Sequence, residues 1–279
     1  MTWFSMQVSS LVILSLCVAT SALAGLDEDL LKAVQARDKT KVAQLLAAGA
    51  NPNAKGFQGR TALHLAVILK PDKSITELLL QAGAQVDGQG GFGTPLIEAA
   101  SWGNTEVVEL LWSKGANVNA TNSLGSTALI YAAHGGHRAT VELLIAKGVD
   151  VNAKTTSSHV TALMDASLEG YPDTVDLLLS KGADVHVADT HGDTAMHRFF
   201  QGRGGASRFM TAYGAMVRRG DPAVPRLLLA KGADASARNI EGQTPLFLCE
   251  QNPQRCLPET KELLAKAMVK DGTGSRKQF

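Results

Sequence analysis

Two short motifs have the residue types and spacing of known chemical sites. Residues 88–93 read Gly-Gln-Gly-Gly-Phe-Gly and match G-x-G-x-x-G, which binds a pyrophosphate when it lies between a strand and a helix. The surrounding sequence lacks a βαβ unit, so we interpret the segment as a glycine-rich loop and predict no cofactor. His134 and His137 have the spacing of a metal pair, but no Cys or carboxylate follows at ligand spacing. We interpret both as structural histidines and predict no metal.

The sequence carries no signature of a catalytic site. It has no G-x-S-x-G elbow, no H-E-x-x-H, no Walker loop, and no isolated Cys and His that suggest a nucleophile. The pair of Asp165 and His134 is too generic to suggest a reaction, so we predict that the chain is not an enzyme. A small-ligand or metal carrier remains an alternative, with His191, His197 and Arg198 as its candidate polar groups.

The composition limits the class of partner. Of the 279 residues, 45% are apolar and 19% are charged, as in globular proteins. The 27 Lys and Arg residues against 26 Asp and Glu give a net charge of +1, which provides no global field for a nucleic acid. We therefore expect no nucleic-acid partner. Only 5% of residues are aromatic and 27 are glycine, which indicates short helices closed by many turns.

The first 24 residues have the pattern of a secretory signal peptide. They contain no charged side chain, residues 11–19 are almost entirely apolar, and Ala22-Leu23-Ala24 is a small-x-small cleavage site. We predict cleavage between Ala24 and Gly25, with no stable membrane insertion afterwards. Because the segment lacks the usual N-terminal Lys or Arg, an uncleaved anchor that displays the domain on a membrane remains an alternative. Its apolar stretch is marginal against the ~20 residues of a spanning helix.

Export would place the cysteines of the cleaved chain in a compartment where disulfides can form. Cys17 lies within the predicted signal, and the Leu16 before it is not the small residue of a lipoprotein box. Cys249 and Cys256 remain after cleavage, and thiols pair readily in oxidising compartments. If Cys249 lies near a helix end, the six intervening residues, which include Pro253, can bring the two Cβ atoms into range. A disulfide is thus possible, and two free buried thiols are the alternative.

A period of about thirty-three residues runs through the rest of the chain. Thr-x-Leu or Thr-x-Met units recur with spacings of 33, 33, 34, 33 and 50 residues. They begin at Thr61, Thr94, Thr127, Thr161, Thr194 and Thr244. A Gly-Ala-Asn or Gly-Ala-Asp marker, with small variations, keeps the same period. Two interlocked markers over six units indicate a repeat protein.

With these markers the chain resembles the ankyrin-repeat family, whose unit is roughly Gly-x-Thr-Pro-Leu-His-x-Ala-Ala followed by Val-x-Leu-Leu-Leu and Gly-Ala-Asp. The resemblance covers about residues 26–266. It implies an all-α solenoid of helix-turn-helix units joined by β-hairpin loops.

The residues of each unit explain this fold physically. The Thr hydroxyl caps a first helix, and Pro95 after Thr94 occupies a position that needs no donor. A second helix with apolar residues at helical spacing ends where Gly115 or Gly182 can adopt a left-handed conformation. Helices this short are marginal alone, so each repeat must pack on the next.

These patterns predict a signal peptide over residues 1–24, a domain of about seven repeats over 25–268 and a flexible tail over 269–279. The first repeat, near residues 27–53, is expected to be a cap with a polar outer face. The sixth carries about 17 extra residues near 201–222.

This insert is basic. It contains Arg203, Arg208, Arg218 and Arg219 against the single acid Asp221. We hypothesise that it grips an acidic partner segment; a solvated elaboration without a partner is the alternative.

The resemblance implies which positions face a partner. They lie at the hairpin tips and on the first helices, which form the concave face of such stacks. Large aromatic side chains there are typical binding anchors, although each ring can instead pack against its own neighbour. The predicted partner-binding residues are Phe57, Arg60, Phe92, Glu98, Trp102, Leu124, Tyr131, His134, Asp165, Glu169, His191 and Arg198.

We therefore predict an exported scaffold that binds another protein through its concave face and hairpin tips, without catalysis. The resemblance favours a bacterial exported member, periplasmic first and secreted second. An immunity-like inhibitor of an exported enzyme or toxin is a further alternative. The sequence does not indicate the partner's identity or the oligomeric state.

Overall fold

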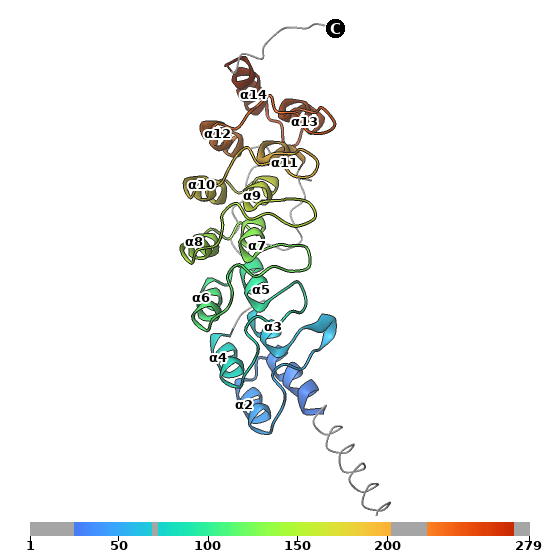
Figure 1. The fold of residues 1–279 in the computed structure, drawn as a ribbon, viewed down its shortest axis with the longest axis vertical. Helices are drawn as coiled ribbons and strands as arrows, with labels where there is room; N and C mark the ends of the chain where they lie inside the picture. The colour runs from blue at the N-terminus through green and yellow to red at the C-terminus, as the bar shows by residue number, and fades with distance from the viewer. Residues whose placement is uncertain (1–24, 69–71, 202–221, 271–279) are drawn as a thin grey trace, which may run out of the picture. The chain divides into compact units, whose positions relative to one another are not determined.

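The computed structural model describes residues 25–68, 72–201 and 222–270 (Figure 1). Within these ranges the chain is helical, with no strand and two isolated bridges, Gly90 with Gly93 and Thr121 with Thr127. The predicted all-α class is confirmed, while the inter-repeat loops are hairpin-like turns rather than strand ladders. The described residues form two compact units. Unit 1 contains residues up to Ala99 together with Glu106–Asn117, and unit 2 contains Ala100–Thr105 and the residues from Val118 onward.

Unit 1 consists of short helices and one hairpin tip with a 3₁₀ turn. Residues 25–35 are helical. The following elements are α2 (Lys39–Ala47), η1 (Phe57–Gly59), α3 (Ala62–Val67), α4 (Lys73–Gln81), most of α5 (Pro95–Ser101) and most of α6 (Thr105–Ser113). Helix α4 packs against both α2 and α3.

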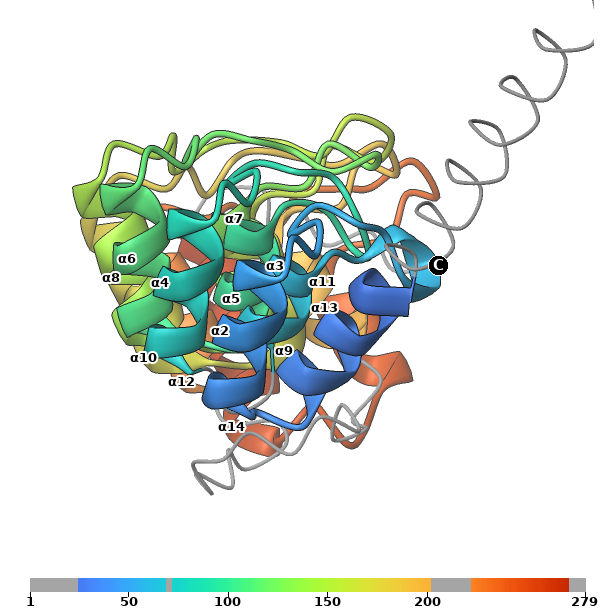
Figure 2. The ribbon, with the colours of Figure 1, turned by 90° about the horizontal axis from the view of Figure 1, so that it is seen from below.

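The described residues of unit 2 form four helix pairs in two layers. The first helices are α7 (Ala128–His134), α9 (Ala162–Glu169), α11 (Ala195–Gln201) and α13 (Pro245–Gln251). The second helices are α8 (Arg138–Ala146), α10 (Pro172–Ser180), α12 (Ala223–Ala230) and α14 (Pro258–Lys270). Helix α9 packs between α7 and α11, and α10 between α8 and α12. The long loops of unit 2 extend on the same side of its helices (Figure 2).

The first helices begin at the predicted threonines. The hydroxyl of Thr127 accepts a hydrogen bond from the Ile130 amide at 3.4 Å, and that of Thr161 accepts from the Met164 amide at 3.3 Å. Each bond satisfies one of the amides that a helix start leaves without a partner inside the helix. The repeat period therefore fixes where each first helix begins.

The second helices end at the predicted glycines. Gly115 and Gly182 have φ angles of 90° and 91°, a left-handed conformation that favours glycine. The next amide then reaches back into the helix, as Ala183 does to the Leu178 carbonyl at 3.0 Å. The chain can turn directly toward the next hairpin.

The core of unit 2 lies between the layers. Leu129, Leu144 and Leu163 are at most 1% exposed, and they come from α7, α8 and α9. Ala132 and Ala166 are fully buried and let neighbouring first helices approach closely. Each pair buries its apolar face against the next pair, as a repeat stack requires.

Three predicted features fall wholly or largely outside the described residues. They are the signal peptide with its cleavage site after Ala24, the basic insert with Arg203, Arg208, Arg218 and Arg219, and the C-terminal tail. Helix α14 continues through Lys270, so the helix runs two residues past the predicted end of the repeat domain at residue 268. The insert is bounded by α11, which ends at Gln201, and α12, which begins at Ala223.

Candidate functional site

Two neighbouring hairpin tips in unit 1 present exposed aromatic rings. Phe57 is 83% exposed and Phe92 is 60% exposed. The Arg60 guanidinium carbon lies 5.2 Å from the centre of the Phe92 ring, a cation–π geometry. The Arg60 Nε donates to Glu98 Oε1 at 3.1 Å. We call Phe57, Arg60, Phe92 and Glu98 the hairpin-tip cluster.

The glycine-rich loop positions this cluster. Gly91 has a φ of 54°, and a Cβ there would collide with the Glu98 carboxylate. A Cβ on Gly90 would collide with the backbone of Gly59 in the preceding hairpin. The loop amide of Phe92 donates to Glu98 Oε1 at 3.0 Å. The glycines thus let two hairpins approach closely and allow a loop amide to donate to the Glu98 carboxylate. In nucleotide-binding loops, a phosphate is the anion that accepts from such amides.

Glu98 differs from its expected exposure. The sequence places it among the solvent-facing residues, but it is 1% exposed because it accepts hydrogen bonds from Arg60 and from the Phe92 amide. The side chain of Arg60 is 17% exposed. Glu98 therefore positions the exposed rings rather than facing a partner itself.

Helices α7 and α9 of unit 2 carry a charged face. His134 Nδ1 lies 3.9 Å from Asp165 Oδ2 and 3.9 Å from Glu169 Oε1, and the His134 side chain is 45% exposed. Tyr131 lies one turn before His134 and is half-buried; its hydroxyl accepts a hydrogen bond from the Asn122 side chain at 3.1 Å. We call Tyr131, His134, Asp165 and Glu169 the charged face.

Within the charged face, the pKa of the Asp165 carboxyl is strongly shifted. Burial raises the pKa of its carboxyl from 3.8 to about 6. The positive charges of His134 and Arg198 lower this pKa, while the Glu169 carboxylate raises it further, and these effects are smaller than that of burial. The charge of the face therefore changes in mildly acidic solution.

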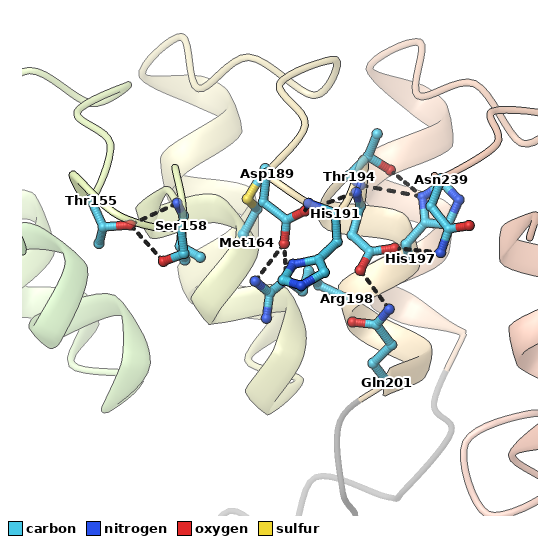
Figure 3. Close-up of polar contacts among 12 residues, drawn as sticks. Thr155, Ser158, Met164, Asp189, His191, Thr194, His197, Arg198, Gln201 and Asn239 are labelled. Atoms are coloured by element: carbon cyan, nitrogen blue, oxygen red, sulfur yellow. Dashed lines mark hydrogen bonds and ion pairs between the residues drawn. The ribbon is translucent and has the colours of Figure 1, made fainter. Parts of the chain in front are cut away.

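A shallow polar cleft of about 280 Å³ lies between α11 and the two adjacent loops of unit 2. It is lined by His191, Asp193, Arg198, Gln201, Asn239, Ile240, Glu241 and Gln243. Figure 3 shows the Arg198 guanidinium beside the Asp189 carboxylate; the bonds from Nε and Nη2 to Asp189 Oδ2 measure 2.9 and 2.5 Å. The Asp189 side chain is fully buried, so it fixes the direction of Arg198.

Sequence reasoning missed most of the residues behind this cleft. Asp193 is 5% exposed and accepts from Gln201 Nε2 at 2.7 Å and Asn239 Nδ2 at 2.9 Å. Asp189 and Asn239 each stand three residues before a glycine and accept amide hydrogen bonds within their own loops. This spacing is typical of Asx turns, and it is the signal that could have identified both residues as loop organisers.

The histidines have separate structural contacts. His64 Nδ1 accepts from the Thr61 amide at 3.2 Å, so its Nε2 carries the proton and donates to the Gly93 carbonyl at 3.1 Å in the next hairpin. His197 makes the same pair of contacts with Thr194 and Gln243. His137 Nε2 bonds to the Ser101 carbonyl at 3.1 Å, whereas His134 faces the carboxylates of α9. In the described ranges, no group of three or more His, Cys, Asp and Glu could hold a metal ion.

The comparisons with known proteins identify the repeat. The family model described as "Ankyrin repeats (3 copies)" matches residues 30–122 and 115–189, more than half of the chain. The chain belongs to the ankyrin-repeat family. The human ASB11 ankyrin repeat domain has the same fold, with a TM-score of 0.66 and 24% identity over 85% of this chain and 96% of that one.

Curated relatives share shorter stretches of this ankyrin chain. "Protein PhlB" of Serratia liquefaciens is 38% identical over 34% of this chain and 42% of its own length. "Glycerophosphocholine phosphodiesterase gde1" of Schizosaccharomyces pombe is 36% identical over 31% of this chain and 8% of its own. "Ankyrin repeat and KH domain-containing protein 1" of Homo sapiens is 43% identical over 19% and 2%. The chain thus spans less than half the length of each relative.

The other predicted partner-binding residues of the ankyrin fold lie in unit 2. Leu124 is 56% exposed and Trp102 is 36% exposed, and His191 is exposed at the rim of the cleft. Arg198 is held by Asp189, and its side chain is 20% exposed. None of the helices in the described part of the chain is long and apolar enough to cross a membrane.

Cys249 and Cys256 form a disulfide in this structure, with their Cα atoms 4.9 Å apart. Cys249 belongs to the last turn of α13 and is fully buried, whereas Cys256 is half-buried in the loop that follows. The bridge closes a short loop between α13 and α14, which we call the disulfide loop (residues 249–256).

Proposed function

We propose that this ankyrin-repeat protein is an exported scaffold that binds another protein through the hairpin-tip cluster of unit 1 and the charged face of unit 2. Ankyrin repeats generally act as protein-interaction scaffolds. The observation that carries the proposal is the pair Phe57 and Phe92, two rings that are 83% and 60% exposed at adjacent tips. Among the described residues of unit 1, Trp112 is the other exposed large apolar side chain.

The hairpin-tip cluster has the properties of a binding anchor. Burying a phenylalanine ring contributes about 1.5–3 kcal/mol, so a partner that covers both rings gains a large part of a specific interaction. Arg60 already holds one face of the Phe92 ring, and Glu98 holds Arg60. This ordering lowers the entropic cost of association, because the side chains are fixed before the partner arrives.

The charged face supplies specificity rather than bulk affinity. Asp165 and Glu169 lie one helical turn apart on α9 beside the exposed His134 ring. Charges at an interface rim mainly change the association rate and the choice of partner. We expect a partner segment with positive charge to favour this face.

Export is the second part of the proposal. The apolar stretch and the Ala-Leu-Ala sequence before residue 25 favour a cleaved signal, with the periplasm first and secretion second. The Cys249–Cys256 disulfide suits an oxidising compartment. The intact mass of the exported chain tests this, because cleavage removes 24 residues and a disulfide leaves no alkylatable thiol without a reductant. A retained leader or two alkylated thiols would contradict it.

Co-purification tests the binding function. The full chain is expressed with a tag, and its cleaved form, Gly25 to Phe279, is recovered from the exported fraction. A Phe57→Ala/Phe92→Ala variant is treated in the same way. Phe247→Ala is the matched control, because this ring is 44% exposed but lies on α13 of unit 2. We expect one protein to be recovered with the wild type and the control and lost with the double variant. Equal recovery with all three would contradict the proposed surface.

A further inference from the structure

The last turn of α11 is held by side chains of the disulfide loop. Asn252 Nδ2 donates to the Phe200 carbonyl at 2.9 Å, and Arg255 Nη1 donates to the Phe199 carbonyl at 3.0 Å. Carbonyls in the last turn of a helix have no partner within the helix, and these two side chains donate to two of them. A loop more than fifty residues away in sequence thus supports the end of α11.

Arg255 is built into the protein rather than lying on its surface. It is 7% exposed, and its guanidinium carbon lies 5.5 Å from the centre of the Phe199 ring. Phe199 and Phe200 are 3% and 1% exposed and meet edge to face, with ring centres 5.0 Å apart. A positive charge at a helix C-terminus is favoured by the helix dipole. Arg255 therefore links the loop to the core beneath α11.

The disulfide restricts where Asn252 and Arg255 can be. Within the loop, the Asn252 amide continues the last turn of α13, and the Arg255 amide bonds to the Asn252 carbonyl at 2.9 Å. Cys249 is anchored in α13, so the bridge fixes the far end of the loop at Cys256. Closing a loop by a covalent bond removes much of its conformational freedom.

Helix α11 in turn forms one wall of the polar cleft. Arg198 and Gln201 project from it, and Gln201 is the last residue of the helix. Gln201 bonds to Asp193, which also accepts from Asn239 across the cleft. The order of the cleft therefore depends on the last turn of α11.

We propose that the Cys249–Cys256 disulfide is a redox-responsive support for α11, and that its reduction releases Asn252 and Arg255 and loosens the last turn of α11 and the polar cleft. This goes beyond the proposed binding function and does not depend on the identity of a partner. The supporting loop, the helix and the cleft all belong to unit 2.

The reductant is a dithiol. Its thiolate attacks Sγ of Cys256, the more exposed of the two sulfurs, and the S–S bond breaks with Cys249 leaving as a thiolate that takes up a proton. The second thiol of the reductant then attacks the mixed disulfide and releases Cys256. Two electrons and two protons pass to the protein, which holds two thiols, and the reductant becomes a cyclic disulfide.

Hydrogen exchange on the mature chain tests this support. Amide exchange is followed by mass spectrometry with and without a dithiol, and alkylation confirms that both thiols are free. We expect exchange at residues 199–201 to accelerate about tenfold on reduction, the size expected for losing one or two hydrogen bonds. Amides of α7 in the same unit should change less than twofold. Unchanged exchange in α11, or an equal rise in α7, would overturn the proposal.

Two variants keep the test independent of the redox treatment. Arg255→Met removes the donor but leaves the disulfide, so exchange at residues 199–201 should rise while the thiols stay oxidised. Arg238→Met is the matched control, because its exposed guanidinium also donates to a backbone carbonyl, that of Gly242, but in another loop. Equal behaviour of the two variants would show that Arg255 does not support α11.

Discussion

The hairpin-tip cluster of unit 1 and the charged face of unit 2 show how one repeat design makes two different surfaces. At the tips, apolar rings are exposed and the charge that orders them, Glu98, is 1% exposed. On α7 and α9 the arrangement differs, because the polar His134 side chain is 45% exposed and lies 3.9 Å from the Asp165 carboxylate, while the apolar Ala133 and Ala166 on these helices are fully buried. The buried framework stays constant, and the few positions it leaves free determine the chemistry of each surface.

The largest expected effect is on the buried charge of unit 1. Glu98→Ala removes the carboxylate that accepts from both the Arg60 Nε and the Phe92 amide, so we expect the free energy of unfolding to fall by about 3 kcal/mol. Glu98→Gln keeps the shape and one acceptor and should cost about 1 kcal/mol. Denaturant unfolding measures both. If Glu98→Ala were as stable as the wild type, the carboxylate would not order the tips.

The second effect concerns Asp165 of unit 2. Its pKa is raised to about 6 in the folded state, so the folded chain holds this proton more tightly than the unfolded chain, and stability falls as the pH rises from about 4 to 6. Asp165→Asn removes this penalty and should be more stable than the wild type at pH 7.5 by about 1–3 kcal/mol. The free energies of unfolding of the wild type and the variant, measured at pH 7.5 and at pH 4, check this. A difference that persists at pH 4 would contradict the titration.

The buried His64 gives a smaller dependence of stability on pH, and its direction is opposite to that of Asp165. Burial lowers the pKa of His64, so the unfolded chain binds protons more readily and stability falls as the pH drops below about 6.5. The free energy of unfolding of unit 1 should therefore fall between pH 7 and pH 5. His64→Asn should make this free energy depend less on pH over the same range. Hydrogen exchange in α3, read at both pH values, measures it for unit 1 alone. An unchanged slope in the variant would mean that another group titrates.

Local signals in the sequence predict the fold because each acts over a few residues. Thr127 and Thr161 cap helices through amides three residues later, and Gly115 and Gly182 end helices through their own φ angles. None of these features needs a distant contact, so the repeat period alone locates them.

The site is less predictable because its geometry depends on distant residues. Glu98 is buried by Arg60, 38 residues away in sequence, and by a loop whose shape depends on Gly90 and Gly91. Likewise, the support of α11 by Arg255 joins residues 56 apart. A position within a repeat indicates which residues can face solvent, but only the packing of neighbouring loops decides which ones do.

The affinity of the recovered partner for single tip variants tests the central claim most directly. Calorimetry with the wild type, Phe57→Ala, Phe92→Ala and the control Phe247→Ala gives a Kd for each, and unfolding measurements verify that the variants are folded. We predict that each tip variant weakens binding at least about tenfold, with stability changed by less than about 0.5 kcal/mol, and that the control binds like the wild type. A Kd unchanged by both tip substitutions would contradict the account.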